Sequence, residues 1–264
     1  MLVKRFIIWV GVGLLWMTQL FAGQTVKLVT TDWEPYVRDE EDYHGYVYEI
    51  VQAALAAAGY QVDIQFLPWT EAVRLVEQGE VDGIFPKYMP IEPEANLSYS
   101  RPFSGGPLVL YKRKDSDATF DYVETAAAQD NPFTQLMPYT VGVVAGYGNV
   151  SGFDQLTDVS TRPVKTDRDN LYQLFRGEVD FIFIDKYTAV YLLENILPQD
   201  YEDQLEFVLP ALAYQQLYVA FVKEHPQAKE WLAAFNRGLL MIRQNGVMDQ
   251  IIDRDARLAG GQVA

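Results

Sequence analysis

Cysteine is absent from the 264-residue sequence. Its absence excludes disulfides, thiolate catalysis, cysteine-based metal sites and a lipid-modified N-terminal cysteine. Histidine is scarce, with His44 in a polar loop and His225 ahead of a proline. The sequence also has no Gly-x-Ser-x-Gly nucleophile motif and no cluster spaced like metal ligands. We therefore expect no catalytic residues, no metal site and no cofactor, and the chain is predicted not to be an enzyme.

Positively charged residues are also few. The sequence has 21 Lys and Arg residues and 36 Asp and Glu residues, which gives a net charge of −15. A surface this acidic repels nucleic acid and anionic lipid, and it keeps a protein soluble and monomeric. We expect a monomer that binds a small molecule and no nucleic acid. Aromatic residues are plentiful at 14%, and such side chains often line small-molecule clefts.

Only one long apolar run occurs, and it lies at the N-terminus. Lys4 and Arg5 precede the run at residues 6–21, and the small residues Ala22 and Gly23 follow it. This order predicts a cleavable secretory signal peptide over residues 1–22, with an uncleaved membrane anchor as the alternative. Because an exported chain without a lipid anchor stays with the cell only inside a compartment, we expect the bacterial periplasm. Removal of the signal peptide with Lys4 and Arg5 would leave 19 basic and 36 acidic residues, a net charge of −17.

One short motif occurs twice, as Gly79-Glu80-Val81-Asp82 and as Gly177-Glu178-Val179-Asp180. Each copy follows a segment with helical periodicity, and each glycine suits the left-handed residue that closes a helix. An apolar run follows each Val-Asp pair and indicates a buried parallel strand. The same helix–glycine–strand joint, repeated about a hundred residues apart, predicts two similar α/β lobes.

The remaining pattern supplies the other helices and strands of each lobe. In the first lobe they alternate with short connections, which favours a parallel sheet with right-handed crossovers. Thr70 is expected to cap the helix before the first repeat. The expected strands are 26–30, 62–66, 108–112, 140–145, 162–166 and 217–222, and the expected helices are 46–58, 71–78, 169–176, 187–195 and 227–244. Residues from 259 onward are expected to be disordered.

Short motifs that are individually weak follow one another in a fixed order along the chain. They are Thr30-Thr31-Asp32-Trp33-Glu34-Pro35-Tyr36, Gly45-Tyr46-x-x-Glu49, Pro68-Trp69, the first repeat, Tyr99-Ser100-Arg101-Pro102-Phe103, Val141-Gly142-Val143-x-x-Gly146, and the second repeat with Asp185. Their order and spacing resemble the bacterial extracellular solute-binding proteins of family 3, the periplasmic proteins that serve polar amino acid ABC importers.

The resemblance covers nearly the whole chain after the predicted signal peptide and implies a fold. It implies an α/β, two-lobe periplasmic-binding-protein-like fold, in which each lobe is a mostly parallel sheet flanked by helices and two hinge strands join the lobes. The first lobe would comprise residues 24–113 and 211–258, the second lobe residues 114–210, and the disordered tail residues 259–264.

The resemblance also implies where a ligand would bind. Family members stack aromatic side chains on the ligand after the first strand and before the second helix, which are the places of Trp33, Tyr36 and Trp69. Asp185 matches the acceptor for a ligand's amino group, although an Asp before a helix is otherwise an N-cap. The turn after residue 145 matches the carboxylate receptor, since N–H groups at a helix start bind anions. The expected ligand-binding residues are Trp33, Tyr36, Trp69, Lys87, Tyr88, Gly146, Tyr147, Asn149 and Asp185.

One departure from the family pattern concerns the ligand's carboxylate. Members that bind α-amino acids carry an arginine soon after the first repeat, whereas here Pro93-Glu94 is followed by Ala95-Asn96. Lys87 is the nearest cation and Arg101 a less favoured substitute, and a lysine offers a point charge instead of a planar fork. The expected ligand is a small polar solute, an amino acid or a related amine or organic acid, which an inner-membrane ABC transporter permease would receive in a transient complex.

Two other functions remain open. A few relatives of this fold are periplasmic dehydratases, and a cleft with Lys87 and Asp185 could carry out proton chemistry. The chain could also act as a free sensory ligand-binding subunit. A dinucleotide fingerprint is disfavoured, because the third glycine of Gly146-x-Gly148-x-x-x-Gly152 departs from the usual spacing, even though Asp167 follows at a suitable distance. Paired carboxylates such as Glu92 and Glu94 are interpreted as solvated loop charges.

Overall fold

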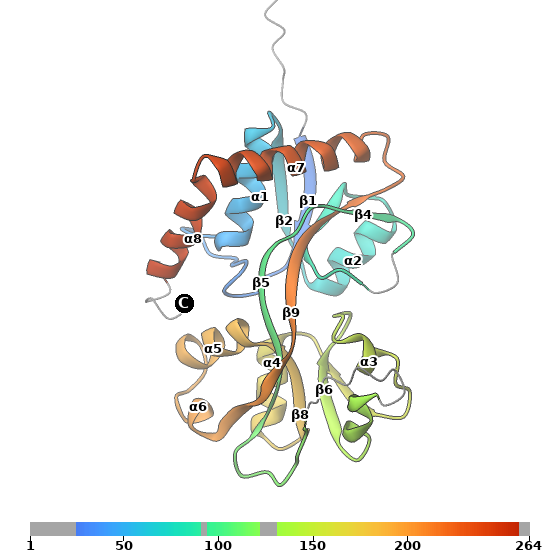
Figure 1. Ribbon diagram of the computed structural model, residues 1–264, viewed down its shortest axis with the longest axis vertical. Helices are drawn as coiled ribbons and strands as arrows, with labels where there is room; N and C mark the ends of the chain where they lie inside the picture. The colour runs from blue at the N-terminus through green and yellow to red at the C-terminus, as the bar shows by residue number, and fades with distance from the viewer. Residues whose placement is uncertain (1–24, 91–93, 122–130, 259–264) are drawn as a thin grey trace, which may run out of the picture.

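The computed structural model describes residues 25–90, 94–121 and 131–258 and consists of two lobes, one above the other in Figure 1. The predicted signal peptide at 1–22 and the predicted tail at 259–264 lie outside the described residues, as do Glu92 and Pro93. Among the residues that the structure describes, no helix combines the length and the apolar character needed to cross a lipid bilayer.

Lobe 1, the upper lobe in Figure 1, is built from both ends of the described chain. Its strands are β1 (Thr25–Thr30), β2 (Gln61–Phe66), β3 (Gly83–Lys87) and β4 (Leu97–Tyr99), and its helices are α1 (Tyr46–Ala57), α2 (Trp69–Glu77), α7 (Ala228–Gln244) and α8 (Val247–Leu258). β1 lies between β2 and β3 and is parallel to both. Because successive strand residues point to opposite faces, Leu28 packs with α1 and α7, whereas Val29 packs with α2.

Lobe 2, the lower lobe, repeats this arrangement. Its strands are β6 (Thr140–Val144), β7 (Ser160–Val164) and β8 (Phe181–Asp185), and its helices are the 3-10 helix η1 (Pro132–Leu136), α3 (Ser151–Asp154), α4 (Asp167–Phe175), α5 (Lys186–Asn195) and α6 (Asp200–Gln204). β6 lies between β7 and β8 and is parallel to both. The alternation recurs in β8, where Ile182 packs with α4 and α5 and Phe183 packs with η1 and α3. The predicted α/β fold with two similar lobes is confirmed.

The repeated motif forms the same joint in both lobes. Gly79 and Gly177 have φ angles of 67° and 68°, and each backbone N–H donates to the carbonyl three residues earlier. The next residue's N–H donates to the carbonyl five residues earlier, which completes a Schellman motif at the end of α2 and of α4. The carboxylates of Asp82 and Asp180 then each accept a 2.8 Å hydrogen bond from the backbone of the neighbouring parallel strand.

Two long antiparallel strands link the lobes, β5 (Phe103–Arg113) and β9 (Leu205–Val222), and Figure 1 shows them running side by side from one lobe to the other. β9 pairs with β3, and β5 pairs with β8, so the sheet is continuous through both lobes. β9 is longer than the strand expected at 217–222, because its pairing with β5 continues past Pro210 through an irregular register shift. The division of the chain at 113/114 and 210/211 stays a prediction.

One local expectation was wrong, and one helix was not predicted. Thr70 does not cap α2, because the helix begins at Trp69 and Pro68 occupies the N-cap position without a side-chain cap. A second C-terminal helix, α8, follows α7 after Gly246. A buried ion pair of 3.0 Å between Arg38 and Asp255 holds α8 against the loop that follows β1.

Candidate ligand-binding cleft

The loop after β1 enters the junction between the lobes in a fixed conformation. Trp33 and Val37 exchange two backbone hydrogen bonds of 2.8 and 3.0 Å, which form a tight bridge around the proline. The Trp33 side chain is 7% exposed, and its ring lies 4.6 Å from the ring of Tyr36. Strand geometry thus places a large aromatic side chain at the carboxyl end of β1, where α/β sheets form their binding crevices.

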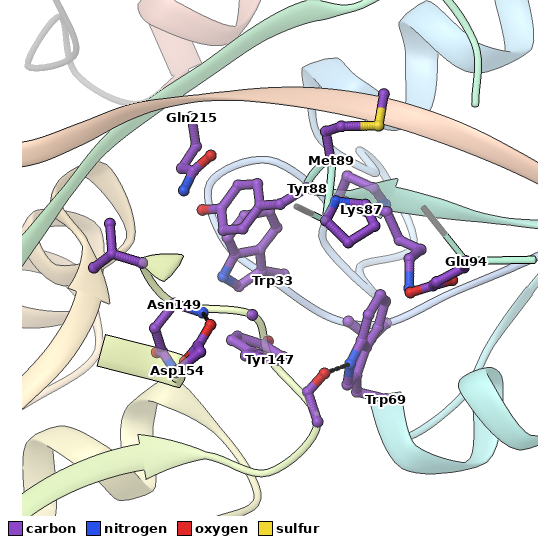
Figure 2. A pocket seen from close by; sticks show the side chains of 16 residues that line it. Trp33, Trp69, Lys87, Tyr88, Met89, Glu94, Tyr147, Asn149, Asp154 and Gln215 are labelled. Carbon is purple, nitrogen blue, oxygen red and sulfur yellow. Dashed lines mark hydrogen bonds and ion pairs between the residues drawn. The ribbon is translucent and has the colours of Figure 1, made fainter. Parts of the chain in front are cut away.

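A cleft of about 350 Å³ lies beside this loop, between lobe 1 and the turn after β6 of lobe 2. Figure 2 shows the side chains that converge on it from the loop after β1, the end of β3, the turn after β6, and β9. Of the predicted ligand-binding residues, those that line this cleft are Trp33, Trp69, Lys87, Tyr88, Gly146, Tyr147 and Asn149. Tyr36 and Asp185 do not line it. Met89, Glu94, Asp154 and Gln215 line it without having been predicted.

Aromatic rings form the wall of the cleft. The ring of Trp33 lies edge-on to Tyr88 and Tyr147, at centroid distances of 5.7 and 6.3 Å. Trp69 lies edge-on to Tyr147 at 5.8 Å, and its indole N–H donates a 3.0 Å hydrogen bond to the carbonyl of Gly146. Since Trp69 belongs to lobe 1 and Gly146 to lobe 2, this bond holds the lobes together at the mouth of the cleft.

Lys87 lies at the cleft, but its charge is already paired. Its Nζ is 2.8 Å from Oε1 of Glu94 and lies 5.8 Å from the ring centre of Trp69. The interpretation of Glu94 as a solvated loop charge is therefore wrong, because its carboxylate accepts from Lys87 at the edge of the cleft. The pair presents no net charge to a ligand.

The turn after β6 is internally hydrogen-bonded as well. The backbone N–H of Asn149 donates to Oδ2 of Asp154 at 2.9 Å, and the Asn149 side-chain amide donates to Oδ1 at 3.0 Å. The helix that follows, α3, has four residues. The Asn149 N–H that was expected to receive a ligand's anion thus binds a carboxylate of the same chain (Figure 2).

Asp185 is the N-cap of α5, the role expected of an Asp before a helix. Its Oδ1 caps α5 by accepting from the backbone N–H groups of Tyr187 and Thr188, at 2.9 and 3.2 Å. The same oxygen accepts a 2.9 Å hydrogen bond from the Tyr36 hydroxyl of lobe 1. Its Oδ2 has no hydrogen-bond partner among the described residues. Burial raises the pKa of Asp185 to about 6, although the Tyr36 hydroxyl, the α5 N–H groups and the Tyr88 hydroxyl lower it.

Asp167, the first residue of α4, was not predicted as a site residue. Thr166 caps this helix with its side chain, while the Asp167 side chain is buried and its Oδ2 also lacks a partner among the described residues. Burial, together with the charge of Asp185, raises the pKa of Asp167 to about 7. The Trp33 indole and the Tyr147 hydroxyl oppose this rise, and Glu34 adds to it. We call Asp167 and Asp185 the carboxylate pair.

A second cavity of about 650 Å³ lies on the other side of the aromatic wall. Trp33, Trp69 and Tyr147 line both spaces. Glu34 of lobe 1 and Arg168 of lobe 2 line the second cavity and form an ion pair of 3.3 Å across the junction. Within the described part of the chain, no group of three or more metal-ligating side chains could hold a metal ion.

Residues 26–254 match the model of the bacterial extracellular solute-binding proteins, family 3. The chain belongs to this family. The match spans both lobes and confirms the resemblance seen in the sequence motifs. A comparison with curated proteins found no match.

Solved structures share the two-lobe fold of the family. A mutant of ArgBP from T. maritima is 18% identical, with a TM-score of 0.68 over 87% of this chain and 94% of that chain. A histidine kinase sensor domain with similarity to periplasmic binding proteins is 18% identical, with a TM-score of 0.70 over 88% and 96%. The GluR0 ligand-binding core from Nostoc punctiforme, in complex with L-glutamate, is 15% identical, with a TM-score of 0.66 over 87% and 98%. At these identities the likeness concerns the fold.

Proposed function

We propose that this family 3 protein captures a small polar solute, an amino acid or a related amine or organic acid, between its two lobes and delivers it to an inner-membrane ABC permease. The predicted signal peptide supports a periplasmic location. The observation that carries the proposal is the cleft of about 350 Å³, which is lined from both lobes by aromatic and polar side chains. This volume and lining suit a small-molecule site.

Closure of the lobes would be driven by the ligand as a shift of population. Contacts between the lobes include the hydrogen bonds Trp69 to Gly146 and Tyr36 to Asp185 and the ion pair Glu34 to Arg168. Each hydrogen bond contributes about 1 kcal/mol net, and a partly exposed ion pair contributes about 1 kcal/mol or less. A ligand that touches both lobes adds to these contacts only in the closed state, so it favours that state by its differential affinity.

The class of solute is supported by the similar structures, which include the L-glutamate complex of the GluR0 core and ArgBP. A second candidate function is sensing, which the similarity to a histidine kinase sensor domain favours. In both functions the cleft binds the solute reversibly and leaves it chemically unchanged. A dehydratase on this fold would instead convert its ligand, so recovery of the ligand unchanged separates binding from catalysis.

A thermal-unfolding screen of the mature protein against amino acids, amines, organic acids and small sugars tests the proposal. A ligand at about 100 times its dissociation constant stabilises the native state by about 2.7 kcal/mol, which raises the melting temperature by several degrees. We expect such a rise with at least one solute, and mass spectrometry should recover that solute unchanged. If no solute of these classes shifts the melting temperature, or if the bound solute is consumed, solute capture is the wrong function.

A further inference from the structure

A small cavity adjoins the cleft and shares lining residues with it. Its volume is about 10 Å³, and it is lined by the carboxylate pair and by Trp33, Tyr88 and Tyr147, which also line the cleft. A cavity of about this size holds one water-sized group. A primary ammonium, or one terminal nitrogen of a guanidinium, has that size.

Two carboxylates face this cavity, and its lining also holds two donors without a hydrogen-bond partner among the described residues, the Trp33 indole N–H and the Tyr88 hydroxyl. Asp185 is 3% exposed and Asp167 is 6% exposed, and each has an Oδ2 without a hydrogen-bond partner among the described residues. Leaving buried carboxylate oxygens unpaired costs free energy, and two such groups close together repel each other. A cation placed between them donates to both and offsets their negative charge.

The groups that would hold a ligand's carboxylate are, by contrast, bound to acids of the chain itself. Glu94 pairs with Lys87 at 2.8 Å, and Asp154 accepts both from the backbone and from the side chain of Asn149. An incoming carboxylate would have to displace one of these acids or lie beside it, and either arrangement costs free energy. The lining of the cleft therefore favours a ligand with a positively charged group and disfavours a ligand that also carries a carboxylate.

The rest of the cleft suits the body of an organic cation. The Trp33, Trp69, Tyr88 and Tyr147 rings offer apolar area to methylene groups and π faces to a positive charge. The net charge of −15 also attracts cations to the protein from solution.

We propose that the solute is an organic cation, an amine or guanidinium compound without a carboxylate, whose charged group lies between Asp167 and Asp185. This inference rests on the proposed function and narrows its ligand class. It differs from capture of an α-amino acid, because the binding energy comes from the carboxylate pair and the aromatic wall and none comes from a carboxylate clamp.

Isothermal titration with matched compounds tests the inference. Agmatine, putrescine and cadaverine are compared with arginine, ornithine and lysine, which differ from them by one carboxylate each. We expect at least one of the decarboxylated compounds to bind at least tenfold more tightly than its amino acid. If the amino acid of each pair binds as tightly or more tightly, or if only anionic or neutral solutes bind, the inference is overturned while solute capture stands. If no compound of any class binds, solute capture itself has failed.

The variant Asp167→Asn locates the cation. It keeps the size of the side chain and removes its charge, so affinity for the tightest decarboxylated compound should fall about 10- to 100-fold. Asp158→Asn, the same change at an exposed position of lobe 2, serves as the matched control and should leave the affinity unchanged. Circular dichroism verifies that both variants fold. An unchanged affinity in a folded Asp167→Asn protein would mean that the cavity holds water only, and the inference would be wrong.

Discussion

The burial of Asp167 predicts that removing its charge stabilises the protein. The side chain is 6% exposed and faces Asp185, Glu34 and the Tyr147 hydroxyl. Burial raises its pKa from 3.8 to about 7, so ionisation is less favourable in the folded chain than in the unfolded chain. The substitution Asp167→Asn replaces the carboxylate with an amide of the same shape and removes this penalty.

The magnitude follows from the shift in pKa. A rise of about three pKa units at about 1.4 kcal/mol per unit gives a penalty of about 4 kcal/mol at pH 8. Because the folded-state pKa is raised, the contribution of Asp167 is fully favourable below about pH 3.8 and is lost as the pH rises through about 7. The advantage of the variant should therefore grow with pH, by about 2–3 kcal/mol between pH 5 and pH 8.

Urea unfolding of wild type and Asp167→Asn at pH 5, 6.5 and 8 measures this effect, with Asp158→Asn as the control for a surface charge. The expected result is a gain in the free energy of unfolding that increases from pH 5 to pH 8 for Asp167→Asn and stays constant for the control. A wild type more stable than the variant at pH 8, or a difference independent of pH, would refute the reasoning. Asp167→Asn should thus gain stability and lose cation affinity together. Both effects follow from the buried charge of Asp167, which destabilises the folded chain and which a bound cation would neutralise.

Three further predictions concern the junction between the lobes. Trp69→Phe keeps an aromatic ring, though a smaller one, and removes the N–H donor to Gly146. Closure should lose about 1 kcal/mol, and apparent affinity should fall about fivefold in titration calorimetry. Unchanged affinity would show that this bond contributes nothing to closure. Gly106→Ala places a methyl group against the Tyr36 hydroxyl and both carboxylate oxygens of Asp185, so affinity should fall more than tenfold in the same assay, and a variant that binds normally would contradict the packing described. Affinity for the tightest cation should rise from pH 5 to pH 8, because the carboxylate pair, with pKa values raised to about 6 and 7, must lose its protons to bind; a flat profile would exclude the pair from the site.

The fold could be predicted from the sequence because its signals are local. The two glycines of the repeated motif close their helices through bonds that span five residues at most, and the apolar run after each one indicates the next strand. The length of β9 could not be predicted, because Pro210 normally ends a central strand. Here Leu108 of β5 pairs with Ala213 of β9, and Leu110 pairs with Val208. Two positions along β5 therefore correspond to five along β9, and this irregular stretch contains the proline.

The lining of the candidate cleft could be predicted in part, for a related reason. Aromatic residues at strand ends were found because the carboxyl edge of a parallel sheet is known in advance. Asp167 was missed because an acid in the first turn of a helix is usually exposed and favourable there. The structure buries it where the lobes meet, in a cavity that Trp33 and Tyr88 of lobe 1 also line. The bond between Tyr36 and Asp185, 149 residues apart, is likewise a consequence of how the lobes meet.

A solute held between the lobes should draw them together, and small-angle X-ray scattering measures this movement. The radius of gyration of the mature protein is measured alone and with the tightest-binding solute at saturation, as judged by calorimetry. We expect a smaller radius of gyration with the solute than without it. An unchanged radius at proven saturation would contradict capture by closure.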